Sequence, residues 1–430
     1  YMTKFQLIVM GLCAIFLVGG VAAFATFRAN QNAQAPEITL WGSLDTSDFQ
    51  KVLSDARITN KAQLNISYVE KSAQTFEKDL VEALARGEGP DMILMPHDLI
   101  VRQSDKAYVI PYKSYTERLF KDSFIQGAEL FLAPEGVLGL PFSVDPLVMY
   151  WNRDIFLAAG LPKPPKLWGE FFEIAPKLTK RDTSGNITQS VVALGDFRNV
   201  QNAKEILVAL TNQAGDPIII RRADGSFDSV FGSRQNTMLV PAEEALRFFT
   251  EFSNPSKSSY SWNRSLTDSL TAFVGGKLAV YFGFASELES IREKNPNLNF
   301  DVALLPQIKD APVPKTYGAL HAFVILKTSK NIPAAYTAAV TLTSSPLVSN
   351  WARTSGLPPV RTDLLLDTPT DAYKSILYSS ALIAEAWFDP EPLYSLRVLS
   401  DMVDNVTSGK LRLSEGVRET SVLFDDIVGR

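Results

Sequence analysis

Residues with side chains suited to metal or nucleophilic chemistry are few in this sequence. It contains two histidines, His97 and His321, and one cysteine, Cys13, among 430 residues. A single cysteine excludes an intramolecular disulfide and any metal site built on several thiolates. Two histidines leave little for metal binding or for a Ser-His pair, and the motifs HExxH and GxSxG and a glycine-rich phosphate loop do not occur. We therefore predict no cofactor and no metal site.

Acidic residues, in contrast, are plentiful. The chain holds 47 Asp and Glu against 42 Lys and Arg, which gives a formal net charge of −5. Glycoside hydrolysis needs a pair of carboxylates, and chance pairs are unavoidable at this number, so a carbohydrate-active enzyme stays open as an alternative. The acidic balance argues against a nucleic-acid partner, which would need a basic surface.

Alternating strands and helices are predicted near the N-terminus, and they would position the residues of this segment that could contact a ligand. Apolar periodicity predicts strands and helices, in order, at 37–41, 46–55, 63–69, 75–85 and 91–95. This order is typical of βαβ units and a mainly parallel sheet. Ligands bind beyond the carboxyl ends of such strands. We therefore expect Trp41, Ser43, Thr75 and His97 on one rim of the sheet.

The length of the chain and one of its joints predict two lobes. At 430 residues a single core is not expected. A strand at 137–140 is followed by Pro141 and almost at once by a second apolar run at 147–151, which is the pattern of a chain crossing between lobes. An Asx residue at 152–154 caps the next predicted helix, 155–159, and Gly160 ends it.

The N-terminal segment 5–27 carries no charge and is about 23 residues long, enough to span a bilayer. Ala23-Phe24-Ala25 could serve as a signal-peptidase site, but this length favours an uncleaved membrane anchor over a removed secretion signal. We predict an anchor at 1–28 and a polar tether at 29–36. The bulk of the chain would then lie outside the cytoplasm at the cell membrane.

A long ordered pattern resembles a known family. The segment GLPFSVDPLVMYWNRDIFLAAGLPKPPKLWGEF, beginning at Gly139, is similar to the signature of extracellular solute-binding proteins of ABC importers, the sugar-binding group that includes maltose-binding protein. The runs GEGPD at 87–91 and GKLAVY at 276–281 also resemble family motifs. Trp151 between Tyr150 and Asn152 is a small departure from the pattern. The resemblance covers about 390 residues, everything after the tether.

The resemblance implies an α/β fold with two lobes, the periplasmic-binding-protein fold, here preceded by the transmembrane helix. Each lobe is discontinuous, and hinge crossings join them. The implied first lobe is 37–143 and 284–322, the second lobe is 147–281 and 327–430, and the hinges lie near 144–146, 282–283 and 323–326.

The resemblance also implies a function: a carbohydrate binds between the lobes and stabilises a closed form, which the permease subunits of an ABC importer recognise. The membrane would be contacted only through the N-terminal helix. Two alternatives stay open, a membrane-anchored carbohydrate-active enzyme and a ligand-sensing module for a signalling partner. The identity of the ligand is open too, since an anion or a polyamine is compatible with the pattern.

The implied ligand-binding residues combine aromatic faces with polar groups. Aromatic rings stack on sugar rings, and planar polar groups bind hydroxyls. Alternatives are a core position for each tryptophan, a helix cap for Asp45, a hinge contact for Asp145 and a structural role for each histidine. The expected set is Trp41, Ser43, Asp45, Thr75, His97, Asp145, Trp262, Phe284, Tyr317, His321 and Trp387.

Overall fold

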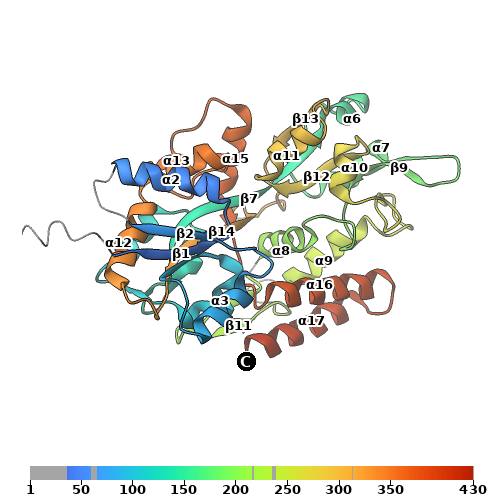
Figure 1. Cartoon of the computed structure of the whole chain (residues 1–430). Coiled ribbons are helices and arrows are strands. Elements are labelled where there is room, and N and C mark those ends of the chain that lie inside the picture. Colours follow the sequence, from blue (N-terminus) through green and yellow to red (C-terminus); the bar gives the residue numbers. More distant parts are fainter. Residues whose placement is uncertain (1–35, 60–64, 216, 235–238, 312, 430) are drawn as a thin grey trace, which may run out of the picture.

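Two lobes lie side by side and share a long central strand (Figure 1). The computed structural model describes residues 36–59, 65–215, 217–234, 239–311 and 313–429. The predicted membrane anchor at 1–28 and the tether up to residue 35 lie outside this part of the chain. Within the described residues, every helix is too short or too polar to cross a membrane.

The first lobe contains the βαβ units that the sequence predicts. Strands β1 (Ile38–Gly42), β2 (Ile66–Glu70) and β3 (Met92–Pro96) run parallel. Helices α2 (Thr46–Thr59) and α3 (Phe76–Ala85) connect them. The parallel strands and the helices between them confirm the α/β prediction for this segment. β3 is a nearly continuous apolar run and is buried, as strands of a parallel sheet usually are.

The central strand is β7 (Leu140–Asn152), which belongs to both lobes. Its first half pairs with β14 (Thr316–Ile325), and its second half pairs with β12 (Leu278–Phe284) and β13 (Phe300–Ala303). The predicted break at Pro141 is therefore wrong. A register shift between His321 and Ala322 of β14 faces Pro141, and such an irregularity accommodates the missing N–H.

Two separate buried cores define the lobes. Val144 packs in the first core and Leu147 in the second, so the chain first crosses at 145–146. The chain returns between Tyr317, in the second core, and Leu320, in the first. The core positions are consistent with the predicted hinge at 144–146 but not with those at 282–283 and 323–326.

The lobe bounds after residue 282 also differ from the expected ones. Residues 284–317 pack in the second lobe, as Phe300 and Val302 show, whereas residues 327–365 pack in the first lobe, as Leu347 and Val360 show. The reason is strand pairing: β12 stays against β7 in the second lobe, and β14 is the strand that returns. After Leu365 the chain runs along the junction of the lobes: Leu377 packs in the second core, Ala381 and Ala384 in the first, and Trp387 in the second.

The remaining elements surround these strands. The first lobe holds η1 (His97–Leu99), α4 (Ile100–Gln103), η2 (Ser104–Lys106), β4 (Ile110–Pro111), α5 (Glu117–Ser123), η3 (Ala128–Phe131), β5 (Leu132–Ala133), β6 (Gly136–Val137), α12 (Ile332–Leu342), α13 (Ser345–Ser355) and α14 (Thr362–Leu365). The second lobe holds α6 (Arg153–Ala158), α7 (Glu170–Leu178), β8 (Lys180–Arg181), β9 (Ile187–Val192), α8 (Ala203–Ala214), α9 (Pro241–Glu251), α10 (Ser269–Val274), α11 (Glu287–Lys294), α16 (Pro392–Thr407) and α17 (Leu413–Val428). The hairpin β10 (Ile219–Arg221)–β11 (Phe227–Ser229), α15 (Ala372–Leu382) and β15 (Ala384–Glu385) lie at the junction of the lobes.

Candidate functional site

The end of β3 places His97 at the boundary between the lobes. Its side chain is buried, and Nδ1 accepts a hydrogen bond from the Leu320 N–H at 3.2 Å. The neutral ring therefore carries its proton on Nε2, which lies 3.1 Å from the Tyr317 hydroxyl oxygen. Burial lowers the pKa of His97 to about 4. His97 is thus a neutral donor that joins β3 to β14.

Asp98 and His321 extend this polar edge of the first lobe. Nδ1 of His321 lies 3.4 Å from the Ser143 hydroxyl, and burial lowers the pKa of His321 to about 4. Burial raises the pKa of Asp98, while Lys204 and His321 act in the opposite direction. Lys204 belongs to the second lobe, so charge from across the boundary between the lobes acts on Asp98.

The second lobe contributes charged residues from the first turn of α8. The Lys204 ammonium lies 2.8 Å from Oδ2 of Asp389, and the Ser395 hydroxyl donates to the same oxygen at 3.0 Å. Burial raises the pKa of Asp389, and the adjacent Lys204 partly offsets this. Burial also raises the pKa of Glu205, the next residue on α8. The ion pair between Lys204 and Asp389 thus belongs to a polar surface of the second lobe.

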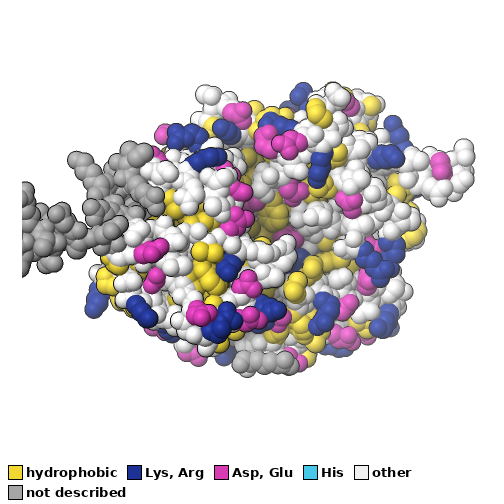
Figure 2. Space-filling model, viewed as in Figure 1, with side chains coloured by type: hydrophobic (Ala, Val, Ile, Leu, Met, Phe, Trp, Pro, Cys, Tyr) yellow, Lys and Arg dark blue, Asp and Glu magenta, His cyan; other side chains and the backbone are white. Residues whose placement is uncertain are grey.

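The acidic groups among these residues act electrostatically on the Tyr317 hydroxyl. Burial raises the pKa of Tyr317 well above its usual value, and the neighbouring carboxylates of Glu205, Asp98 and Asp389 raise it further. Carboxylates from both lobes therefore influence one hydroxyl, which lies 3.1 Å from Nε2 of His97. Figure 2 shows a hollow between the lobes with acidic side chains along its margin. We define the cleft cluster as His97, Asp98, Lys204, Glu205, Tyr317, His321 and Asp389.

A groove on the second lobe adjoins the cleft cluster. It has a volume of about 390 Å³ and is lined by residues 197–205, Asp268 and the start of α16. Leu393 and Leu396 of α16 line it and are 78% and 43% exposed. It combines polar groups with apolar surface, as small-molecule sites do. Among the described residues, no group of three or more His, Cys, Asp or Glu is arranged to hold a metal ion.

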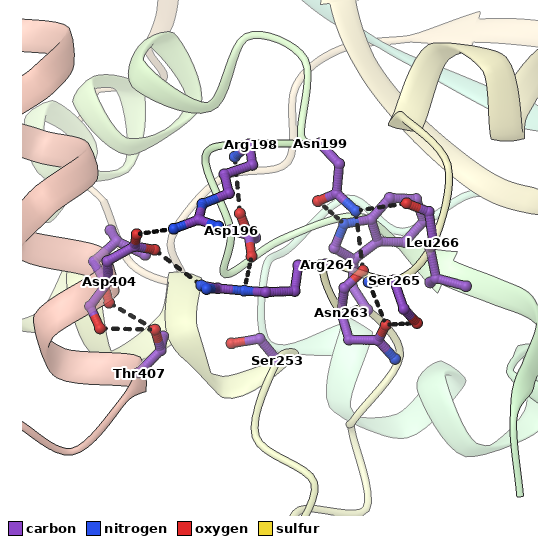
Figure 3. Close-up of polar contacts among 12 residues, drawn as sticks. Asp196, Arg198, Asn199, Ser253, Asn263, Arg264, Ser265, Leu266, Asp404 and Thr407 are labelled. Atoms are coloured by element: carbon purple, nitrogen blue, oxygen red, sulfur yellow. Dashed lines mark hydrogen bonds and ion pairs between the residues drawn. The ribbon is translucent and has the colours of Figure 1, made fainter.

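A polar network fixes the loops behind this groove (Figure 3). Arg264 binds Asp196 at 3.1 Å and Asp404 of α16 at 3.0 Å. Asn199 accepts from the indole N–H of Trp262 at 2.9 Å and donates to the backbone carbonyls of Asn263 and Leu266. The network ties the loop before α8 to α16; Lys204 lies at the start of α8, and Ser395 lies on α16.

The predicted site residues divide into three groups. His97, Tyr317 and His321 meet in the cleft cluster, and the Phe284 ring centroid lies 6.0 Å from that of Tyr317. Asp145 lies at the first crossing, where its carboxylate accepts from the Ser286 N–H at 3.1 Å.

The second group lies along the carboxyl edge of β1. Trp41 is half-buried with the Lys71 ammonium 3.9 Å from its ring centroid, and Ser43 follows it, also half-buried. Asp45 caps α2, accepting from the backbone N–H groups of Ser47 and Asp48. Thr75 is exposed at the start of α3. These four share an edge with His97 but are not in the cleft cluster.

The third group is buried in the second core. Trp262 is 1% exposed and Trp387 is 3% exposed, so neither presents an open face to a ligand in this structure. The prediction also missed Asp98, Lys204, Glu205 and Asp389. Asp98 follows His97 directly, and Lys204 and Glu205 are the two charged residues of an otherwise uncharged helix, so those signals were available.

The stability of the protein is expected to fall between pH 4 and pH 7 because of Asp145. Burial raises the pKa of Asp145 to about 7, whereas its unfolded value is 3.8. In this window the folded state binds a proton that the unfolded state has released, so raising the pH costs stability. Asp145→Asn removes this dependence. Urea unfolding of both proteins should show the parent losing about 4 kcal/mol relative to the variant across the window; parallel profiles would contradict the assigned pKa.

Comparisons with known proteins identify a family and a fold. A family model described as bacterial extracellular solute-binding protein matches residues 55–376. The galactooligosaccharide-binding protein of Bacillus subtilis (strain 168) is 21% identical over 361 residues, which cover 81% of this chain and 80% of that protein. An sn-glycerol-3-phosphate-binding periplasmic protein of Pectobacterium atrosepticum is 22% identical over 315 residues, which cover 69% of this chain and 66% of that protein.

A solved structure confirms the two-lobed periplasmic-binding-protein fold. The cyclic α-maltosyl-1,6-maltose-binding protein of Arthrobacter globiformis matches with a TM-score of 0.74 at 16% identity. The match covers 91% of this chain and 99% of that chain.

Proposed function

The chain belongs to the bacterial extracellular solute-binding proteins, and we propose that it binds a carbohydrate between its lobes as the substrate-binding component of an ABC importer. The observation that carries this proposal is the cleft cluster, in which His97 of the first lobe lies 3.1 Å from the hydroxyl of Tyr317, a residue of the second core, and acidic residues of both lobes lie near this boundary. A ligand held by both lobes stabilises the closed arrangement, because only that arrangement offers it both sets of partners.

The chemistry of the cleft cluster suits a polyhydroxylated ligand. Carboxylates accept hydrogen bonds from hydroxyl groups, and a neutral histidine and a tyrosine hydroxyl both donate and accept. Half-buried Phe284 adds an aromatic surface beside Tyr317. The related proteins named for oligosaccharides support the same class of ligand.

The charge of the cleft cluster argues against a phosphate ester, the ligand for which some relatives are named. Asp98, Glu205 and Asp389 are acidic, and the single lysine of the cluster is already paired at 2.8 Å. A phosphate would meet like charges in a poorly solvated site, which costs binding free energy. We therefore propose a ligand without a phosphate group.

We further propose that the predicted segment 1–28 anchors the protein in the membrane with the lobes outside the cytoplasm. A tether raises the effective concentration of the binding protein near the permease subunits that would receive the ligand. The chemistry proposed for the cleft is binding, and the carbohydrate would be released unchanged.

Asp98→Asn and Glu205→Gln are each expected to weaken carbohydrate binding about tenfold or more. The physical reason is the loss of a charge-assisted hydrogen bond, which contributes about 1.5–3 kcal/mol. Isothermal titration with maltotriose and galactotriose measures the change. Glu419→Gln, which removes one charge from an exposed position of α17, is the matched control and should leave affinity unchanged. Equal affinities in all four proteins would contradict the placement of the site.

A further inference from the structure

We propose that Arg102 is a positioning residue. Its ion pair with Glu391, which we call the clasp, joins the two lobes and thereby holds the loop that carries Asp389 at the cleft. This inference rests on the proposed closure of the lobes over a ligand. Arg102 lies outside the cleft cluster, and its role would be to set how readily the lobes close.

Arg102 is fixed to the first lobe by its neighbours. It lies on α4, two residues after Ile100, which packs in the first core. Its guanidinium Nε lies 2.7 Å from Oε1 of Glu77 on α3. The side-chain amide of Gln103 donates to the same oxygen at 2.6 Å. The guanidinium is therefore held in place from within its own lobe.

The second partner of Arg102 comes from the other lobe. Its Nη1 lies 2.9 Å from Oε2 of Glu391, the residue before α16. Because α16 packs in the second core through Val398 and Leu399, this ion pair crosses from one lobe to the other. Any rotation that separates the lobes at this point must break it.

Glu391 is joined to the cleft by a short chain of hydrogen bonds. Its backbone N–H donates to Oδ1 of Asp389 at 3.1 Å. The other oxygen of Asp389 binds Lys204 at 2.8 Å and Ser395 at 3.0 Å. Arg102 is thus three contacts away from Lys204, and the position of the loop at 389–391 links the clasp to the cleft cluster.

The surroundings of the clasp set the size of its effect. It lies in a crevice of about 480 Å³ between the lobes, lined by Val101 of the first lobe and by Pro390 and Ile427 of the second. The two side chains are 40% and 35% exposed, so solvent and salt screen the pair. An ion pair of this kind should change the ratio of closed to open molecules by about two- to fivefold, while barely affecting global unfolding.

The test measures the distance between the lobes in the full chain without any ligand. Spin labels are placed at Ser54→Cys on α2 and Glu293→Cys on α11, in a Cys13→Ser background; the two helices lie on different lobes (Figure 1). We expect the parent to show one dominant distance. Arg102→Gln should lower the ratio of molecules at this distance to molecules at a longer distance by about two- to fivefold. Arg102→Lys should restore much of the parent ratio.

Salt and a control variant distinguish the clasp from a general effect. Raising the salt from about 0.01 M to about 1 M should lengthen the distance in the parent but not in Arg102→Gln. Glu88→Gln breaks an exposed ion pair with Arg86 inside the first lobe and should change nothing. The midpoint of urea unfolding should be the same in all variants, because a merely structural loss would move it.

The proposal is overturned if Arg102→Gln and the parent have the same distance distribution, or if the parent itself is already open at low salt. Neither result depends on carbohydrate. Failure of the clasp would therefore leave the proposed binding function standing, and failure of every sugar to bind would leave the clasp standing.

Discussion

Lys204→Met is expected to destabilise the protein by about 3–5 kcal/mol, the cost of leaving a buried charge without its partner. The side chain of Lys204 is 9% exposed and that of Asp389 is fully buried, with 2.8 Å between the charged atoms. Without the ammonium, Asp389 keeps only hydrogen bonds from Ser395 and from the Glu391 N–H. Two such bonds do not replace a counter-charge in a poorly solvated site.

Urea unfolding at several pH values tests this prediction. Removing Lys204 raises the pKa of Asp389 further above its unfolded value, so the folded state holds a proton that the unfolded state loses above about pH 4. The loss should therefore be larger at pH 8 than at pH 4. The double variant Lys204→Met/Asp389→Leu should recover part of the stability, because no unpaired charge remains. A loss below about 1 kcal/mol, independent of pH, would contradict the assigned ion pair.

Trp262→Ala is expected to cost about 3–5 kcal/mol of stability without weakening the contacts of a ligand in the cleft. Trp262 is 1% exposed, packs in the second core, and donates its indole N–H to Asn199 at 2.9 Å. Truncation to alanine leaves a large cavity and removes one of the bonds that hold the loop before α8. Trp262→Phe keeps most of the volume but leaves the Asn199 oxygen without its donor, so a smaller loss of about 1–3 kcal/mol is expected.

Denaturant unfolding gives the stability of both Trp262 variants, and titration at a temperature where they remain folded gives their affinity. The expected pattern is a large loss of stability for Trp262→Ala with affinity close to that of the parent. The opposite pattern, full stability with lost binding, would mean that the Trp262 ring faces the ligand.

The local features of the fold could be read from the sequence because local patterns determine them. The alternating elements at the N-terminus, the cap that Asn152 forms on α6 and the left-handed Gly160 after it follow from nearby residues alone. The crossing at 145–146 was expected from two apolar runs that follow one another almost at once, although the break placed at Pro141 does not occur. His97 was found because it follows an apolar strand at the carboxyl edge of the sheet.

The features that were missed depend on pairing between distant segments. The sequence of a buried strand such as β12 does not show with which strand it will pair. The lobe bounds predicted after residue 282 depended on that pairing. Tryptophan serves equally as a core residue or as a ligand contact, and only the structure shows that Trp387 is buried. Asp389 and Lys204 lie 185 positions apart, so no local pattern could join them.

The most direct test of the central claim is thermal unfolding of a soluble Gln31–Arg430 fragment with a panel of oligosaccharides, phosphate esters and polyamines, followed by recovery of the added compound. A carbohydrate present at about 100 times its dissociation constant should add about 2.7 kcal/mol of stability. We predict such a shift with one class of oligosaccharide, which is recovered intact. A panel in which no carbohydrate shifts the transition, or in which the stabilising sugar is recovered cleaved, would contradict a carbohydrate-binding receptor.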